Sequence, residues 1–230
     1  MVNERSEGLP LVPWTEPSRP TRHRIVETSL VAFAERGYHG ASVRDISRSA
    51  GVTVGTFYTH FGSKETVLFE LMHRGHEAHQ TCVRDALLGT GPEPADQLRA
   101  AISANVAFHA TYPFLTIVGN SELHALDASH RDVIFELRHA AGQLVAAVID
   151  RGRQAGAFDC DDTWLAMSAI AGMGVRVAWW FRPPELLGAE SPTSSYPSRA
   201  ASWLPTGDYD AGVIADAYAE FALRIVGSRR

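Results

Sequence analysis

The stretch of sequence that decides the fold is SVRDISRSAGVTVGTFYTHFGSKE, residues 42 to 65. Its first third carries the signals of a short helix. Ser42 is placed as an N-cap, and Asp45, three residues later, completes a capping box. Gly51 follows as a stop, because glycine readily adopts the left-handed conformation that ends many helices. We therefore predict a short helix between Ser42 and Gly51.

A second short helix is predicted over 54–61, with Thr53 as its N-cap. Phe57 and Phe61 are four residues apart, so they share one face and anchor this helix inward. The two helices meet at residues 50–53, where a small residue and a glycine allow close crossing. Two short capped helices joined by so tight a turn are typical of a helix-turn-helix motif, whose second helix lies in the major groove of DNA.

The outward face of the second helix suits this role, because its side chains are short, apolar or hydrogen-bonding. They are Thr53, Val54, Gly55, Thr56, Tyr58, Thr59 and His60. Arg44 and Arg48 project together from the preceding helix, as a clamp on backbone phosphates would. Lys64 lies in the first turn of the next helix, where a bound phosphate would offset the repulsion from the helix dipole. A structural alternative stays open: Ser42 and Thr53 cap helices with or without DNA, and Tyr58 can pack on the first helix.

The sequence on either side is also helical. An apolar stripe at helical spacing runs from Thr21 to a stop at Gly37, and Ser63 starts a longer helix that ends near Leu88. Further helices are predicted, to within a few residues, over 94–111, 113–126, 129–155, 161–181 and 209–227. Alternating strand patterns with hairpin turns are absent. The predicted fold class is all-α.

The chain divides into three parts. Residues 1–20 hold four prolines among polar residues, which predicts a disordered N-terminal arm. Residues 21–66 form the predicted helix-turn-helix domain, and residues 67–230 form a larger helical domain. Within the larger domain, residues 182–208 hold five prolines and five serines, so we predict a long Pro/Ser-rich loop there.

The net charge of the whole chain argues against DNA as a partner, but the charge is unevenly distributed along the sequence. The 230 residues carry a formal charge of -5 and a pI near 6, but residues 19–64 alone carry +4 and the remainder -9. Two cysteines are too few for a disulfide framework or a thiolate zinc site. No apolar run approaches the roughly 20 residues of a membrane span and no signal peptide is recognisable, so we expect a cytoplasmic protein without a membrane partner.

Residues 21–72 resemble the DNA-binding domain of the tetracycline-repressor (TetR) family. The resemblance is carried by FAERGY at 33–38, SVRDI at 42–46 and the whole run from Ala50 to Glu65. It implies an all-helical homodimer with an N-terminal three-helix reader of a palindromic operator. It also implies a C-terminal domain that dimerises and binds a small-molecule effector.

The resemblance also assigns DNA contacts to individual positions. With the outward residues Val54 and Gly55, the predicted DNA-binding set is Ser42, Arg44, Thr53, Val54, Gly55, Thr56, Tyr58, His60 and Lys64. Val54 departs from the family pattern, because many members carry Lys or Arg at this position. We therefore expect readout to shift toward apolar and shape contacts.

A ligand pocket in the larger domain requires an apolar cavity with a few inward polar groups. The candidates are Asn105, Phe108, His109, Tyr112, Arg176, Trp179 and Trp180. The alternative is that the aromatic side chains pack in the core or in a dimer interface. A buried Arg176 would need an anionic partner. The segment VRVAWWFRP at 175–183 is similar to a subgroup that regulates lipid and steroid catabolism and senses acyl-CoA thioesters, although that subgroup has a shorter link before the last helix.

In this family the last two helices form the dimer. The predicted interface here combines two apolar stripes, Ala166, Ala169, Ile170, Met173 and Val177 on one helix and Val213, Ala217, Phe221 and Ile225 on the other. A two-fold four-helix interface would bury both stripes.

Catalytic and metal chemistry find little support. His73, His76, His79 and Cys82 recur every third residue, but this spacing drifts about 60° per step around a helix, so at most two could share an ion. No nucleophile elbow or phosphate loop is present, and we expect no catalytic residue, metal or cofactor. We therefore interpret the chain as a ligand-responsive repressor released from its operator by a small hydrophobic or acyl-CoA-type effector. The alternatives are a metal-dependent helical enzyme and an adaptor with a vestigial DNA-binding domain.

Overall fold

The computed structural model describes residues 10–181 and 209–228, and these residues form nine α-helices, one short 3-10 helix and no strand. The predicted all-α class is confirmed. The helices are α1 (Pro20–Gly40), α2 (Val43–Ser49), α3 (Val54–His60), α4 (Lys64–Leu88), α5 (Pro94–Thr111), α6 (Pro113–Ser121), η1 (Leu123–Ala125), α7 (Ala128–Gln154), α8 (Thr163–Trp180) and α10 (Ala211–Ile225). The Pro/Ser-rich loop predicted over 182–208 lies outside the described residues, as do residues 1–9 of the predicted arm.

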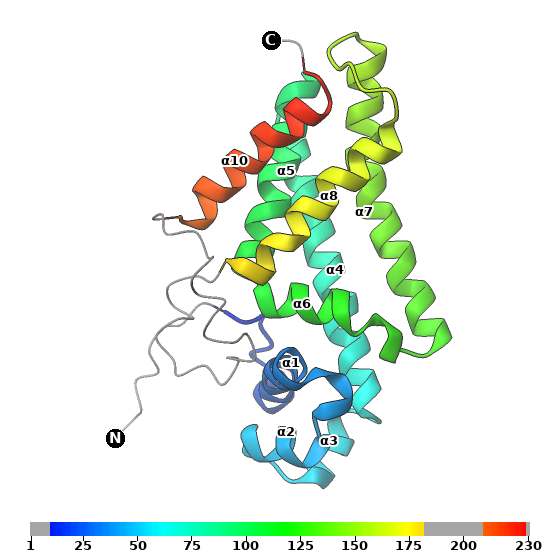
Figure 1. The fold of residues 1–230 in the computed structure, drawn as a ribbon. Coiled ribbons are helices and arrows are strands. Elements are labelled where there is room, and N and C mark those ends of the chain that lie inside the picture. Colours follow the sequence, from blue (N-terminus) through cyan, green and yellow to red (C-terminus); the bar gives the residue numbers. More distant parts are fainter. Residues whose placement is uncertain (1–9, 182–208, 229–230) are drawn as a thin grey trace.

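Helices α1 to α3 form a compact unit at one end of the molecule (Figure 1). The predicted caps are present: the Ser42 hydroxyl accepts a hydrogen bond from the Asp45 N–H, and the Thr53 hydroxyl accepts one from the Thr56 N–H. Gly51 has a φ of 65°, the left-handed conformation that the turn requires. These local bonds fix where α2 and α3 begin.

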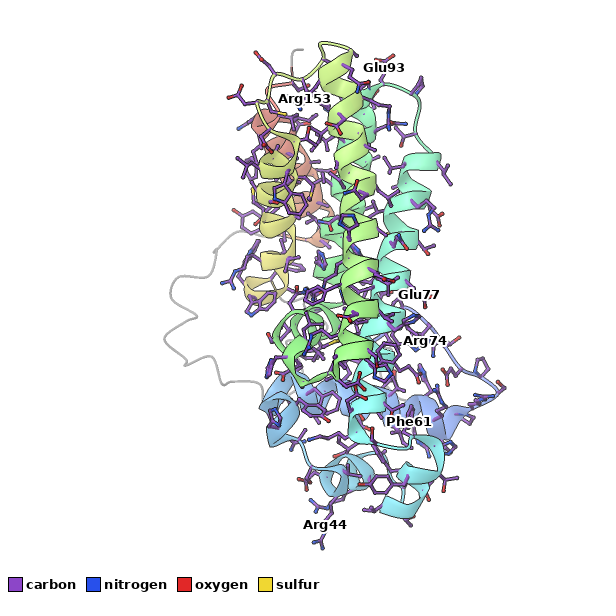
Figure 2. The ribbon with its side chains drawn as sticks, turned by 90° about the vertical axis from the view of Figure 1, so that its right-hand side faces the viewer. Arg44, Phe61, Arg74, Glu77, Glu93 and Arg153 are labelled. Atoms are coloured by element: carbon purple, nitrogen blue, oxygen red, sulfur yellow. The ribbon has the colours of Figure 1, made fainter. Side chains whose placement is uncertain are left out.

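The longest helices run along the rest of the molecule, so that Arg44 lies near one end and Arg153 near the other (Figure 2). α4 connects the two ends, since residues of its first half belong to the same core as α1 to α3 and the helix also packs with α5 and α7. The first apolar core continues past residue 66 into Leu68, Leu71 and Met72 of α4. A second core joins α5, α7, α8 and α10. The apolar core is therefore continuous across residue 66, where the sequence predicted a domain boundary. That boundary stays a proposal.

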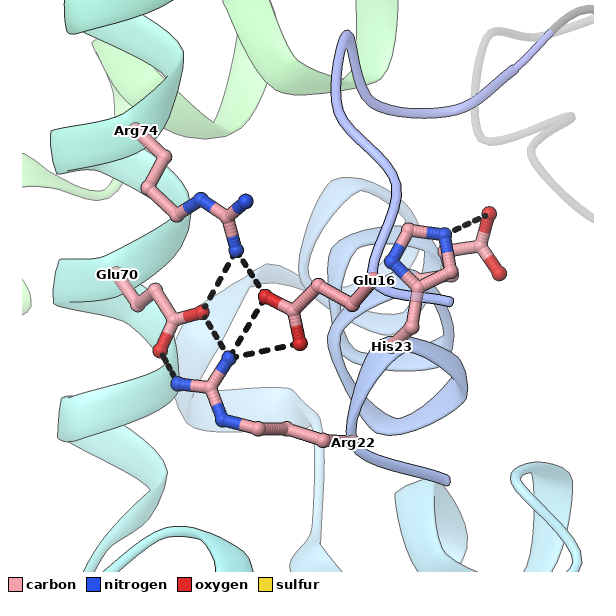
Figure 3. A network of polar contacts seen from close by, with 6 residues as sticks. Glu16, Arg22, His23, Glu70 and Arg74 are labelled. Atoms are coloured by element: carbon pink, nitrogen blue, oxygen red, sulfur yellow. Dashed lines mark hydrogen bonds and ion pairs between the residues drawn. The ribbon is translucent and has the colours of Figure 1, made fainter. Parts of the chain in front are cut away.

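Residues 10–19 depart from the predicted disordered arm, because they are packed against the rest of the protein. Val12 is 2% exposed and belongs to the first apolar core. The Glu16 carboxylate accepts hydrogen bonds from Arg22 of α1 and Arg74 of α4 (Figure 3). The guanidinium of Arg74 also lies over the Trp14 ring, 4.5 Å from its centroid. Residues 10–19 are packed in place because an ion-pair network and apolar contacts with α4 offset the entropy of fixing a proline-rich segment.

Helix α6 lies across the bundle. The chain turns by 94° between α5 and α6, and α6 packs against α1, α4 and α8. It ends at Ser121 and is followed by η1, whereas one helix was predicted over 113–126. Among the described residues no single helix is long and apolar enough to cross a membrane, and α5 with α6 passes that test only as a sharply bent pair.

Candidate nucleic-acid interface and ligand cavity

The outer face of α3 is free of protein contacts over most of its length. Thr53, Val54, Gly55, Tyr58, Thr59 and His60 are exposed, and Thr56 is half-buried. Tyr58 is 51% exposed and meets only the edge of the Phe57 ring among the aromatic contacts of the described residues. It therefore does not pack into the core against α1. Phe57 and Phe61 are buried as predicted, so α3 is anchored by one face and presents the other.

Two features flank this face. Arg44 is exposed and points away from the helices at the end of the molecule (Figure 2). Arg48 is also exposed, and it forms an ion pair with Asp45 at 3.1 Å. The Ser42 hydroxyl is occupied in the cap, where it accepts from Asp45 N–H and donates to the Asp45 carboxylate. If Ser42 also contacts a DNA phosphate, it must do so while its hydroxyl keeps these two cap hydrogen bonds.

Lys64 has an internal role that the sequence did not reveal. Its Nζ donates to the carbonyl oxygens of Tyr38 at 2.7 Å and Ala41 at 2.8 Å. The ammonium also lies 4.1 Å from the centroid of the Tyr38 ring, and burial lowers the pKa of Lys64. The residue thus ties the start of α4 to the end of α1. The helix-dipole argument for a phosphate is weakened, because these protein carbonyls already compensate the cation.

A cavity of about 530 Å³ lies among α4, α5, α6, α7 and α8. This volume is in the range of small-molecule sites. Three of the seven residues predicted to bind a ligand line it: Asn105, Phe108 and His109. The lining residues that are also exposed lie mainly on α7 and α8, which indicates that the cavity opens between these two helices. Figure 1 shows α7 and α8 diverging toward the end that holds α6.

The other four predicted ligand residues, Tyr112, Arg176, Trp179 and Trp180, do not line this cavity. Tyr112 packs against the ring of Phe108 at the edge of the first core. Arg176 is exposed, with its guanidinium 5.3 Å from the Trp179 ring centroid, so no buried anion is needed. Trp180 packs against the second core. α8 turns a different face to the cavity, the one that carries Met167, Ser168, Ile170, Ala171 and Val175.

The polar side of the cavity consists mostly of residues that sequence reasoning did not assign to a ligand. His79 Nε2 lies 2.8 Å from Asn105 Oδ1, and His109 Nδ1 lies 2.9 Å from Thr116 Oγ1. The two imidazole rings are stacked with centroids 5.0 Å apart. Burial lowers the pKa of both histidines. They are therefore neutral hydrogen-bonding groups near pH 7.

His76 and Arg138 complete this polar side. Arg138 Nε donates to His76 Nε2 at 3.1 Å, and His76 Nδ1 lies 2.6 Å from the Met72 carbonyl oxygen. Burial, and then the charge of Arg138, lower the pKa of His76 from 6.5 to about 4. With both ring nitrogens engaged in hydrogen bonds, His76 offers no free lone pair to a metal. Of the predicted histidine run on α4, His76 and His79 form part of the cavity wall, whereas His73 lies outside it and pairs with Glu77.

Within the described ranges, a single group has ligand atoms close enough together to hold an ion: Glu65, Asp127 and His130. Hydrogen bonds account for their positions. His130 Nδ1 lies 2.8 Å from the Glu65 carboxylate, and Asp127 caps α7 by accepting the His130 N–H. The His130 ring also stacks on Phe69 at 3.8 Å. This cluster joins the starts of α4 and α7.

The predicted dimer stripes have different outcomes on the two helices. On α8, Ala166, Ile170 and Val177 are buried within this chain, whereas Ala169 is exposed and Met173 is half-buried, so only part of that stripe can face a partner. On α10, Val213, Phe221 and Ile225 are 49%, 43% and 36% exposed. Helix α8 instead exposes Trp164 and Leu165. The apolar face of α10 remains available for a partner.

Comparison with known proteins gives matches in both halves of the chain. Residues 25–71 match the family model of bacterial regulatory proteins of the tetR family, and residues 91–191 match the tetracyclin repressor-like C-terminal domain. The transcriptional repressor KstR2 of Rhodococcus jostii RHA1 is 26% identical over 164 residues, which cover 70% of this chain and 80% of the relative.

Solved structures agree with these matches. A bacterial regulatory protein of the tetR family from Rhodococcus RHA1 is 28% identical, with a TM-score of 0.76 and coverage of 94% of this chain and 100% of that one. AibR, solved in complex with isovaleryl coenzyme A and operator DNA, shares the fold at 20% identity, with a TM-score of 0.72 over 91% of this chain and 100% of that one. The caps, the presented face of α3 and the matches in both halves agree, and the chain belongs to the TetR family of bacterial transcriptional regulators.

Proposed function

We propose that this protein is a homodimeric repressor that binds a palindromic operator through α3 and is released from it by a small hydrophobic or acyl-CoA-type effector in the cavity. The observation that carries the proposal is the path of α4. Its first turn is tied to α1 through Lys64, and its middle supplies Leu71, His76 and His79 to the cavity wall. One helix therefore contacts both the DNA-reading unit and the ligand site.

The DNA-facing side of the proposal rests on exposure and charge. The face of α3 carries hydroxyl and methyl groups suited to phosphates and thymine. The segment around it is basic, whereas the remainder of the chain is acidic. This distribution directs DNA to the reading unit and restrains binding elsewhere. We propose Ser42, Arg44, Thr53, Val54, Gly55, Thr56, Tyr58 and His60 as the contact set, with Lys64 in a supporting position.

The effector side rests on the cavity and on the relatives. The cavity is mostly apolar, and its wall holds a few polar groups from α4, α5, α6 and α7. Among proteins of the same fold, AibR is bound to isovaleryl coenzyme A together with operator DNA. An acyl chain in the cavity and a CoA moiety toward the opening between α7 and α8 suit this geometry. We therefore propose an acyl-CoA-type or similarly apolar ligand.

A two-fold dimer suits the proposed operator, because a palindrome presents two equal half-sites. We propose that the face of α10 bearing Val213, Phe221 and Ile225 forms the interface with a second copy. A regulator that binds chromosomal DNA acts in the cytoplasm, where we place this protein. We propose no catalytic step for it.

The proposed release mechanism is a population shift. α4 and α6 line the cavity, and both contact α1. The backbone N–H of Tyr38 in α1 donates to the Glu122 carboxylate just after α6, at 3.1 Å. A ligand that favours a different position of α4 and α6 therefore favours a different position of α1 to α3 in each protomer. The two recognition helices then no longer match successive major grooves.

Binding to DNA from upstream of the protein's own reading frame tests the proposal. We expect sequence-selective binding, with two protomers per duplex and an affinity that falls steeply with salt. Tyr58→Phe should weaken binding by about 2- to 10-fold, because it removes one exposed hydroxyl hydrogen bond. Tyr209→Phe, exposed outside the proposed interface with DNA, is the matched control. Equal affinity for unrelated DNA would overturn the proposed function.

A further inference from the structure

The most informative group outside the predicted sites is Arg138. It lies on α7, lines the cavity and is half-buried. Its Nη2 donates to the Gly119 carbonyl oxygen and, at 3.3 Å, to Asn120 Oδ1. Its Nε donates to His76 at 3.1 Å. No ion pair links Arg138 to a carboxylate of the described residues, and the cavity lining holds no Asp or Glu.

The partner of Arg138 Nε is a neutral ring. The Met72 carbonyl can only accept a hydrogen bond, so the nearby His76 Nδ1 carries the proton. His76 Nε2 is then the lone pair that accepts from Arg138. The guanidinium of Arg138 is charged, but its three hydrogen-bond partners are a neutral imidazole and two neutral oxygens. Its positive charge is therefore not balanced by a negative one. Burying such a charge is costly unless an anion is supplied.

A second group in the same cavity also lacks its partner. Asn105 Nδ2 is buried without a hydrogen-bond acceptor, while its Oδ1 is taken by His79. A β-carbon at Gly174 would lie only 2.3 Å from this Nδ2, so the glycine leaves room for the amide. This Nδ2 faces Gly174, which does not line the cavity, so the orphan donor lies within the packed wall between α5 and α8. In the cavity itself, the missing complement is an anionic acceptor at Arg138.

We propose that Arg138 binds an oxyanion of the effector, whose apolar body fills the cavity toward α4 and α5. This inference rests on the proposed function and names the ligand chemistry of its site. Guanidinium groups bind carboxylates and phosphates through strong charge-assisted hydrogen bonds. The oxyanion is either the carboxylate of a free apolar acid or a phosphate of a CoA thioester. Arg138 suits both, because exposed Asn120 and Phe135 beside it mark the opening of the cavity.

The test compares matched ligands on the full-length protein. The probes are straight-chain carboxylates of six to twelve carbons, the alcohols of equal length, and the corresponding CoA thioesters with the phosphate-free pantetheine thioesters as reference. Thermal unfolding reports ligand binding through the shift in Tm. The variants are Arg138→Gln and Arg138→Lys, with Arg131→Gln as the control from the same helix. Arg131 does not line the cavity and donates to the Leu126 carbonyl oxygen.

We expect an oxyanion-bearing probe to stabilise the wild type more than its neutral counterpart of equal acyl length. The apparent affinity for the oxyanion-bearing probe should fall at least tenfold in Arg138→Gln and by less in Arg138→Lys. It should be unchanged in Arg131→Gln. A response to carboxylates identifies a free acid, and a response to CoA thioesters alone identifies a CoA phosphate. Tm without ligand shows whether each variant folds.

Two outcomes overturn the inference: no probe pair shows an excess for the oxyanion in the wild type, or the excess is unchanged in Arg138→Gln. Operator binding by the ligand-free wild type is measured separately. Its absence would remove the proposed function while the ligand series still decides the role of Arg138.

Discussion

At the scale of single residues, His76 and Lys64 show how burial assigns roles that residue type alone does not. His76 is a neutral acceptor for Arg138, because its other nitrogen donates to a backbone carbonyl. Lys64 donates two hydrogen bonds to the carbonyl oxygens of Tyr38 and Ala41. For each residue, a substitution distinguishes a structural role from a role in binding ligand or DNA.

The pH dependence of stability should report on His76. Its pKa is about 4 in the folded protein against an ordinary 6.5, so the unfolded chain binds a proton in this interval and the folded chain does not. Stability is therefore complete above pH 6.5 and is lost as the pH falls toward 4, by up to about 3 kcal/mol from this residue. Buried His79 and His109 act in the same direction.

The measurement is urea unfolding between pH 7 and pH 4.5. His76→Asn should flatten the dependence, whereas His124→Asn, exposed on η1, should leave it unchanged. A slope that is identical in wild type and His76→Asn would show that His76 is protonated in the folded protein.

Replacing Lys64 by Ala should lower stability as well as operator affinity. Two carbonyl oxygens lose a charged donor, which typically costs about 1 to 3 kcal/mol. Arg44→Ala removes an exposed cation and should weaken operator binding with no change in the free energy of unfolding. Chemical denaturation and DNA titration of both variants check this. If Lys64→Ala has unaltered stability, the internal hydrogen bonds of Lys64 contribute little, and its main role is to contact DNA phosphates.

At the scale of the element, the close packing of α7 is decided by its glycines. Near its end, a β-carbon on Gly152 would lie 2.1 Å from a ring carbon of Phe158, a buried residue that folds back onto the helix. Near its middle, a β-carbon on Gly142 would meet only the methyl and sulfur of Met167 at 3.7 Å. The same substitution should therefore have opposite effects at two places in one helix.

We expect Gly152→Ala to destabilise the protein by about 1 to 3 kcal/mol, the usual effect of overpacking. Gly142→Ala should be neutral or stabilising by up to about 1 kcal/mol, because alanine favours helix more than glycine does. Urea unfolding measures both. In a double-mutant cycle, Phe158→Leu should recover part of the loss in Gly152→Ala. Equal stability of the two alanine variants would contradict the packing described for the end of α7.

At the scale of the whole molecule, the proposed dimer and the DNA-reading unit are far apart. α10 lies toward the end of the molecule away from α2 and α3 (Figure 1). A change in the α10 surface therefore leaves each reading unit intact and alters only the pairing of two of them. This separates loss of dimerisation from loss of DNA contacts.

Phe221→Glu should produce a folded monomer, because a charge replaces an apolar side chain that is 43% exposed on the proposed interface. A monomer contacts one half-site, so operator affinity should fall by more than about tenfold, in keeping with the cooperation of two half-sites. Sedimentation gives the oligomeric state, and DNA titration gives the affinity. Leu88→Glu, at an exposed site at the end of α4, is the control. A Phe221→Glu dimer of normal operator affinity would place the interface elsewhere.

The sequence by itself determined the all-helical class, the family and the position of the recognition helix. The signals behind them are local: Ser42 and Thr53 cap helices through bonds to residues three positions ahead, and helical apolar spacing is read over a few turns. The tertiary structure alone decided the cavity, the inward face of α8, the packing of residues 10–19 and the role of Lys64. Arg138 meets a histidine 62 residues earlier, and Lys64 reaches carbonyls 26 and 23 residues earlier. Local signals fix where helices begin, but only the packing of whole helices decides which face of a helix turns inward and which polar groups meet between helices.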